Sequence, residues 1–176
     1  MAEPDILNVQ VTETDVTNTT SETDLFTYTV PGNTLGTNKA LRVQIKADYL
    51  NNSGVNATVR FRVYYGATEM YQDLGATMTT DASRHPVLIE LWLIPRNATN
   101  SQALGGYILQ GVAGGATTGI GDLGNDEILS DSPLRGNDAS EDSTASKVLK
   151  VTVAHSAAST NLSIRKTYSV VELLAP

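Results

Sequence analysis

Cysteine is absent from the 176-residue chain, and so are lysine- or arginine-rich clusters and long hydrophobic runs. Without cysteine there is no disulfide, no thiolate nucleophile and no cysteine-bound zinc, so a hydrophobic core must supply the stability of the fold. The 12 basic residues are outnumbered by 19 acidic ones, which gives a formal net charge of −7. Because affinity for nucleic-acid phosphates depends on clustered cations, this balance predicts that nucleic acid is not a partner.

No stretch approaches the roughly 20 apolar residues that span a bilayer, and the acidic start of the chain lacks the plan of a signal peptide. We therefore expect no membrane partner. Aromatic residues are scarce at 6% of the chain. Small polar residues are abundant instead, with 22 threonines, 13 serines and 12 asparagines. This composition favours strands and turns over long helices.

Alternating apolar and polar residues predict a β protein. In residues 41–49 every second residue is apolar, and residues 59–65 repeat the pattern. A period of two places one set of side chains in a core and the other in solvent. The turn-forming sequence at residues 51–54 lies between these two strands, so we expect them to form a hairpin.

Seven further strands are expected, with a bulge near Lys166 in the last one. Helical periodicity is almost missing: only residues 122–129 fit a turn or two of helix, which Pro133 would end. The nine strands are expected near residues 6–16, 26–30, 41–49, 59–65, 68–74, 87–94, 104–112, 149–153 and 162–170.

This pattern predicts an all-β fold, a two-sheet antiparallel sandwich that spans residues 1–176 as a single domain, with an N-terminal strand or arm over residues 1–20. We favour a jelly roll over an immunoglobulin-like sandwich. The expected wiring places the strands near residues 24, 161, 57 and 104 in one sheet and those near residues 39, 147, 67 and 86 in the other. Loops 51–56, 75–85 and 113–146 then share one end.

The long connection over residues 113–146 is the expected contact loop, with disorder as the alternative. Within it, residues 119–124 match the Gly-x-Gly-x-x-Gly spacing of dinucleotide sites. The strand and the helix that such a site needs are missing around it, so we interpret it as a flexible loop. Four residues with side-chain oxygens lie within and just after this motif, but their spacing does not match a calcium loop, and a helix cap at Asp122 is favoured over a metal site. They are Asp122, Asn125, Asp126 and Glu127.

His85 and His155 are the two histidines of the chain, and we expect both at the surface or in turns. A catalytic triad needs a serine, a histidine and an acid within hydrogen-bonding reach, and a glycosidase needs paired carboxylates. The acidic residues are scattered instead. We therefore expect no enzymatic activity, no catalytic residues and no cofactor; a sandwich hydrolase is the least favoured alternative.

The large side chains that face away from the core pattern predict a contact surface. Trp92 and Tyr64 fall on the register opposite to the main apolar set of their strands, and Leu88 and Ile94 lie beside Trp92 on its strand. Exposed apolar patches usually mark contacts. We predict that Trp92, Tyr64, Leu88 and Ile94 form a subunit interface; a second layer of core and a platform that stacks a sugar ring are the alternatives.

Two stretches resemble virion proteins of tailed bacteriophages. The first is FTYTVPGNTLGT at residues 26–37, which runs into ALRV at residues 40–43, and the second comprises NNSG at residues 51–54 and VRFRVYYG at residues 59–66. The resemblance covers the first half of the chain. It implies a structural role like that of head decoration (cement) proteins, head fibres and tail-fibre or receptor-binding domains, which are often jelly-roll trimers. It brings no catalytic residues with it.

From this resemblance, and because the sequence has no recognisable catalytic or cofactor-binding group of residues, we expect a capsid decoration protein. It would be made in the host cytoplasm, form a homo-oligomer, most simply a homotrimer, and bind the major capsid protein on the virion surface, where it stabilises the head. The alternative is a tail-fibre or head-fibre domain that recognises host glycans through a concave site. The number of copies in each particle distinguishes the two.

Overall fold

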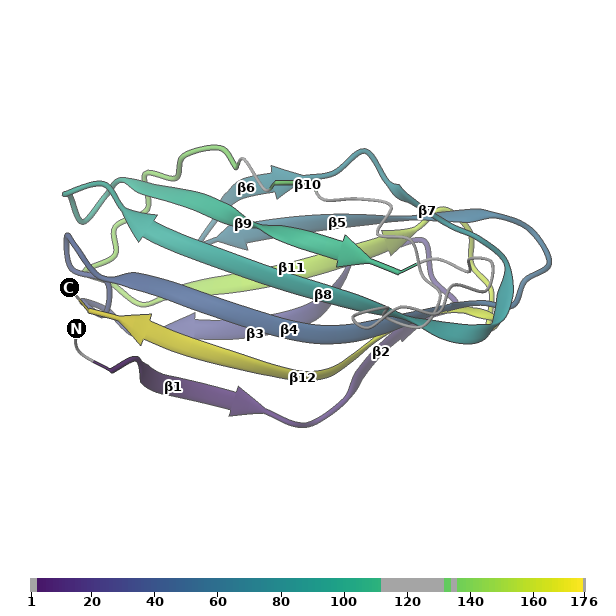
Figure 1. Cartoon of the computed structure of the whole chain (residues 1–176). Helices are drawn as coiled ribbons and strands as arrows, with labels where there is room; N and C mark the ends of the chain where they lie inside the picture. The colour runs from purple at the N-terminus through teal and green to yellow at the C-terminus, as the bar shows by residue number, and fades with distance from the viewer. Residues whose placement is uncertain (1–2, 112–131, 134–135, 176) are drawn as a thin grey trace.

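The computed structural model describes residues 3–111, 132–133 and 136–175, and in these ranges it contains β-strands and no helix (Figure 1). Accordingly, no described helix has the length and apolar character to cross a bilayer. The strands are β1 (Asp5–Gln10), β2 (Thr14–Thr17), β3 (Thr23–Val30), β4 (Ala40–Asn51), β5 (Ala57–Tyr65), β6 (Thr68–Gln72), β7 (Ala76–Met78), β8 (Asp81–Pro95), β9 (Gln102–Gln110), β10 (Ser132–Pro133), β11 (Lys147–His155) and β12 (Leu162–Leu174).

The strands form two antiparallel sheets that pack face to face. The larger sheet has the order β1-β12-β4-β8-β9-β10, with β2 also paired to β12. The smaller sheet has the order β3-β11-β5-β6, with β7 also paired to β5. Figure 1 shows β9, β8 and β4 of the larger sheet in front of β5, β11 and β3 of the smaller one. The arrangement is a jelly-roll-like β sandwich, so the predicted all-β two-sheet fold is confirmed.

The wiring between strands differs from the expected one. β4 and β5 do not form a hairpin, because β4 pairs with β12 and β8 whereas β5 pairs with β11, β6 and β7. The turn at residues 51–54 therefore carries the chain from one sheet to the other. The strands near residues 24, 57, 67 and 147 share the smaller sheet, and those near residues 39, 86, 104 and 161 share the larger. Alternation identifies the side of a strand that faces the core, but both sheets present the same pattern to that core.

All nine expected strand regions contain strands. The structure divides residues 6–16 into β1 and β2, both of which pair with β12, and adds the short strands β7 and β10. The expected bulge is also present, since the register of β12 against β4 shifts between Lys166 and Tyr168. This bulge lies between the β12 segments that pair with β1 and β2.

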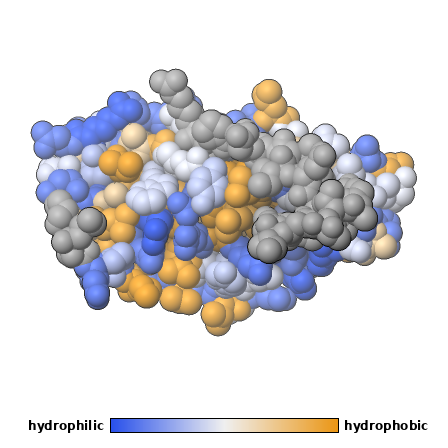
Figure 2. Space-filling model, viewed as in Figure 1, coloured by the Kyte–Doolittle hydropathy of each residue, from blue (hydrophilic) through white to orange (hydrophobic). Residues whose placement is uncertain are grey.

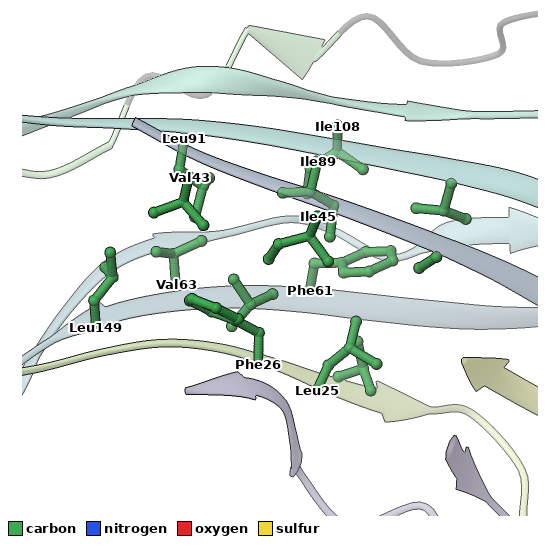
Figure 3. Packing of buried hydrophobic residues seen from close by; sticks show 14 of the residues in the cluster. Leu25, Phe26, Val43, Ile45, Phe61, Val63, Ile89, Leu91, Ile108 and Leu149 are labelled. Atoms are coloured by element: carbon green, nitrogen blue, oxygen red, sulfur yellow. The ribbon is translucent and has the colours of Figure 1, made fainter. Parts of the chain in front are cut away.

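The hydrophobic core fills the space between the two sheets. Val43 and Ile45 of β4 are buried from the larger sheet, and Phe61 and Val63 of β5 are buried from the smaller one (Figure 3). Full burial of one such side chain contributes about 1.5–3 kcal/mol. The core thus explains how a chain without disulfides holds two sheets together.

Loops 51–56 and 75–85 share one end of the sandwich, as predicted, because the Asn51 side chain donates to the Met78 carbonyl oxygen at 2.8 Å. The described part of the long connection lies at the other end. There Ala139 pairs with Gln102, at the start of β9, and the Glu141 carboxylate accepts from the Ala67 amide after β5. The expectation of a single shared end is therefore wrong for residues 136–146. The glycine motif at 119–124, the acidic residues at 122–127 and the short helix at 122–129 lie outside the described residues.

Candidate functional site

The outer faces of the two sheets differ in chemistry. On the smaller sheet, the outward side chains of β5 and β11 are mostly polar, as in Arg60, Arg62, Lys150 and Thr152. On the larger sheet, apolar and aromatic side chains from four strands point outward between charged ones, and Figure 2 shows orange patches among pale and blue residues over this face. They are Ile6, Val9, Leu88, Trp92, Ile94, Tyr107, Leu109, Tyr168 and Val170.

The structure brings together three of the four predicted interface residues. Leu88, Trp92 and Ile94 lie on the outward side of β8, and Ile94 is 43% exposed. Tyr64 lies on β5 of the smaller sheet, so it faces the opposite side of the molecule. Sequence alternation gives the side of each strand but not its sheet, so it does not distinguish the face of Tyr64 from that of the other three residues.

Glu90 organises the centre of the outer face of the larger sheet. Its Oε1 accepts a hydrogen bond from Trp92 Nε1 at 2.9 Å, and its Oε2 accepts one from Gln44 Nε2 at 2.9 Å. Partial burial raises the pKa of Glu90, but hydrogen bonds from Gln44, Trp92 and Tyr107 outweigh it and hold the pKa below its ordinary value. The carboxylate is therefore charged at neutral pH and holds the indole N–H of Trp92.

Arg42 covers part of the indole ring. Its guanidinium carbon lies 5.7 Å from the centroid of the Trp92 ring, and its Nε donates to Glu172 Oε2 at 2.6 Å. A cation–π contact at an exposed site contributes about 0.5–1 kcal/mol. Trp92 is thus held both by the hydrogen bond to Glu90 and by the contact with Arg42.

A pair of glycines lies beside Trp92 on β9. Gly105 is directly opposite Trp92, and Gly106 is opposite Leu91. Gly106 has a φ of 137°, and a side chain there would collide with the Glu90 carbonyl oxygen, so this position needs glycine. Gly105 has open space where a side chain would stand. Because glycine weakens a strand and often marks a close approach of another molecule, the strip beside the indole is suited to contact.

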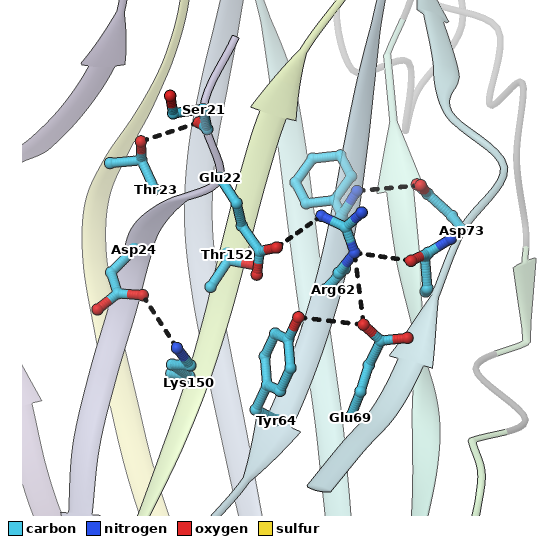
Figure 4. A network of polar contacts seen from close by, with 12 residues as sticks. Ser21, Glu22, Thr23, Asp24, Arg62, Tyr64, Glu69, Asp73, Lys150 and Thr152 are labelled. Atoms are coloured by element: carbon cyan, nitrogen blue, oxygen red, sulfur yellow. Dashed lines mark hydrogen bonds and ion pairs between the residues drawn. The ribbon is translucent and has the colours of Figure 1, made fainter. Parts of the chain in front are cut away.

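The outer face of the smaller sheet carries a network of ion pairs and hydrogen bonds (Figure 4). The Arg62 guanidinium pairs with Glu22 at 2.9 Å and donates to Gln72 at 2.7 Å, and the Tyr64 hydroxyl donates to Glu69 at 3.0 Å. Partial burial, with the nearby carboxylates of Glu22 and Glu69, raises the pKa of Tyr64. Tyr64 therefore belongs to a network of polar contacts within the chain. This argues against a role for Tyr64 in an apolar contact with another molecule.

Neither histidine lies at the surface, contrary to expectation. His85 and His155 are both buried, because each occupies an inward position of its strand. The His85 ring packs against Tyr49 with 5.3 Å between ring centroids, and burial lowers the pKa of His155. Among the described residues, no group of three or more His, Asp or Glu side chains is arranged to hold a metal ion.

Sequence reasoning missed a cleft of about 290 Å³ at one edge of the sandwich. Side chains at the end of β6, in the following turn and on β7 line it together with Ile108 and Gln110 of β9. The signal available in the sequence was an apolar residue, Leu74, directly before Gly75 in a turn. Nothing in the sequence indicated that β6 and β9, which belong to different sheets, lie at the same edge.

No protein-family model matches the chain, and no curated protein matches it. Among solved structures, it is similar to the CBM2 module of the evolved Dit of Lactobacillus casei BL23 phage J-1. The two share 13% sequence identity with a TM-score of 0.38, over 85% of this chain and 69% of the other. A likeness of this size carries no argument about function, and the site must be interpreted from its own residues.

Proposed function

We propose that the chain is a structural protein of a bacteriophage virion, and that it decorates the capsid and stabilises the head. The resemblance of residues 26–43 and 51–66 to virion proteins of tailed phages supports a virion role. The difference between the two outer faces carries the proposal of an attachment surface. The outward side chains of one face are mostly polar and joined by ion pairs, while the other face also carries a group of apolar side chains around Trp92. No catalytic step forms part of this proposal.

In this proposal the face around Leu88, Trp92 and Ile94 packs against a neighbouring copy in a homotrimer. Burial of these side chains supplies the favourable energy, and the Arg42–Glu172 pair beside them favours one orientation of the partner. Attachment of each trimer to several copies of the major capsid protein makes its release require the loss of several contacts at once.

The oligomeric state of the full chain tests the interface. Ile94→Asp places a charge on the outer face of the larger sheet, and Val148→Asp is its matched control on the outer face of the smaller sheet. The two side chains have similar exposure, 43% and 40%. We expect a trimer in sedimentation velocity for the native chain and Val148→Asp, and a monomer for Ile94→Asp. A monomeric native chain, or equal behaviour of the variants, contradicts the interface.

The proposed role on the capsid is tested on particles. Phage particles that lack the chain should lose infectivity at a lower temperature than complete ones, and added native chain should restore the resistance. Ile94→Asp should restore less than Val148→Asp, because single copies make fewer contacts. Unchanged heat resistance without the chain would remove the stabilising role.

The second candidate is a tail-fibre or head-fibre domain that binds host glycans. The observation in its favour is the Trp92 ring with open space over Gly105 and the polar side chains of Glu90 and Gln44 beside it. A handful of copies per particle, together with glycan binding that is lost in Trp92→Ala, would favour this candidate. Tens to hundreds of copies per particle would favour decoration.

A further inference from the structure

The cleft at the sandwich edge has the construction of a ligand site. It lies between β6 and β7 of the smaller sheet and β9 of the larger sheet, and its volume is about 290 Å³. Small-molecule sites begin at about 300 Å³, so the cleft accommodates a ligand of roughly one ring. It lies at an edge of the sandwich and shares no residue with the proposed interface on β8.

Gln110 lines this cleft with a buried acceptor that lacks a donor. The residue is 2% exposed, and its Nε2 donates to the Thr77 carbonyl oxygen at 3.0 Å. Its Oε1 has no hydrogen-bond donor in the part of the chain that the structure describes. An unsatisfied buried polar atom costs about 1–3 kcal/mol, and such atoms are normally bound by a ligand or an ordered water. An occupant of the cleft with a hydroxyl or amine group would supply the donor once the buried Gln110 amide turns toward it.

A stiff turn forms the rim of the cleft. Asp73 Oδ1 accepts hydrogen bonds from the Phe61 amide at 3.0 Å and the Gly75 amide at 3.1 Å. Gly75 has a φ of 101°, which favours glycine, and this backbone turn leaves Leu74 97% exposed at the mouth. A rim that is already ordered loses little conformational entropy when a ligand binds. The exposed Leu74 side chain gives that ligand an apolar contact.

The side chains that line the cleft define the chemistry of its occupant. Tyr71, Leu74 and Ala76 supply apolar and aromatic surface, whereas Asp73 and Gln110 supply acceptors. None of the described lining residues is a lysine or arginine, so an anion would meet no cation there. A purely apolar ligand would leave the Gln110 acceptor unsatisfied. A sugar ring satisfies both requirements, since it has C–H groups on its faces and hydroxyl donors at its rim.

We propose that this cleft binds one sugar unit of a neutral glycan. In the bound state a sugar hydroxyl donates to Gln110 Oε1, a second donates to the Asp73 carboxyl group, and the C–H face packs against Tyr71. This activity goes beyond capsid decoration, because it would let a decorated head adhere to a saccharide surface. It does not depend on the trimer, so the failure of one proposal leaves the other intact.

The test uses the full chain and a variant that fills the cleft. Ala76 lines the cleft, whereas the next residue, Thr77, is exposed and does not line it. Ala76→Phe should therefore block the site, and Thr77→Phe is the matched control. Saturation-transfer NMR with glucose, galactose, N-acetylglucosamine and rhamnose, together with a glycan array, identifies a ligand. Calorimetric titration should then give a Kd raised about tenfold or more in Ala76→Phe and unchanged in Thr77→Phe.

Thermal unfolding shows whether each variant folds. If Ala76→Phe does not, Leu74→Ser at the rim is compared with Val55→Ser, an exposed valine outside the cleft. We expect several-fold weaker binding only in Leu74→Ser. The proposal is overturned if neither the four sugars nor the array give binding, if Ala76→Phe binds like the native chain, or if both rim variants behave alike. Binding that is lost in Trp92→Ala but kept in Ala76→Phe would also overturn it and would assign the glycan to the outer face.

Discussion

Lys166 Nζ donates a hydrogen bond to Gln10 Oε1 at 2.9 Å, which links a buried lysine of β12 to β1 at the edge of the larger sheet. Lys166 has an inward position opposite Ala47, where most side chains are apolar. Burial lowers the pKa of Lys166 below 10.5. The folded state is thus destabilised by an ammonium group that has lost much of its contact with water.

Replacement of this lysine by an apolar side chain of similar length should stabilise the fold. We expect Lys166→Met to raise the free energy of unfolding by about 1 kcal/mol at neutral pH, since a buried charge is removed and the side-chain volume is kept. Urea unfolding measures the change. Lys46→Met, on the neighbouring strand but exposed, is the control and should be neutral. A loss of stability in Lys166→Met alone would mean that the bond to Gln10 outweighs the burial of the charge.

The buried His155 predicts a pH dependence of stability below neutrality. Its pKa is lowered from 6.5 by burial, so between this lowered pKa and 6.5 the unfolded chain binds a proton that the folded chain does not. Stability should therefore be complete above pH 6.5 and decrease as the pH falls through this window. Thermal unfolding across the window should show a shallower decrease in His155→Phe, which does not titrate. Equal slopes in the two proteins would count against a neutral buried histidine.

The two glycines of β9 should respond in opposite ways to the same substitution. Gly105→Ala should be neutral or stabilise the chain by up to about 1 kcal/mol, because its side-chain space is open and alanine restricts the unfolded state. Gly106→Ala should destabilise it by about 1–3 kcal/mol, because of the positive φ and the collision with the Glu90 carbonyl oxygen. Denaturant unfolding distinguishes the two. A large loss of stability in Gly105→Ala would show that the fold of the strand itself, and not contact with a partner, requires this glycine.

The sequence predicted the local features of the fold well, because they depend on periodicity. The alternation in residues 41–49 correctly separated buried Val43 and Ile45 from the outward Gln44 and Lys46. It did not identify the neighbouring strand, since β4 pairs with β12 through residues more than 100 positions away. Long-range pairing of this kind leaves no mark in a single stretch of sequence.

The candidate sites show the same limit. Leu88, Trp92 and Ile94 follow one another on a single strand, so period two places them together. Tyr64 could not be assigned to a face without knowledge of its sheet. The cleft needs residues of β6 and β9 at the same time, and only the packing of the two sheets brings them to one edge.

The position of β12 in the larger sheet also governs the order of assembly during synthesis. It lies between β4 and the pair β1 and β2, yet it follows all the other described strands in the chain. Until β12 emerges, the edge of β4 that pairs with it has no hydrogen-bonding neighbour, and β1 and β2 have no strand with which to pair. Nascent chains should therefore expose unpaired strand edges until β12 has left the ribosome, which makes chaperone protection most valuable before that point.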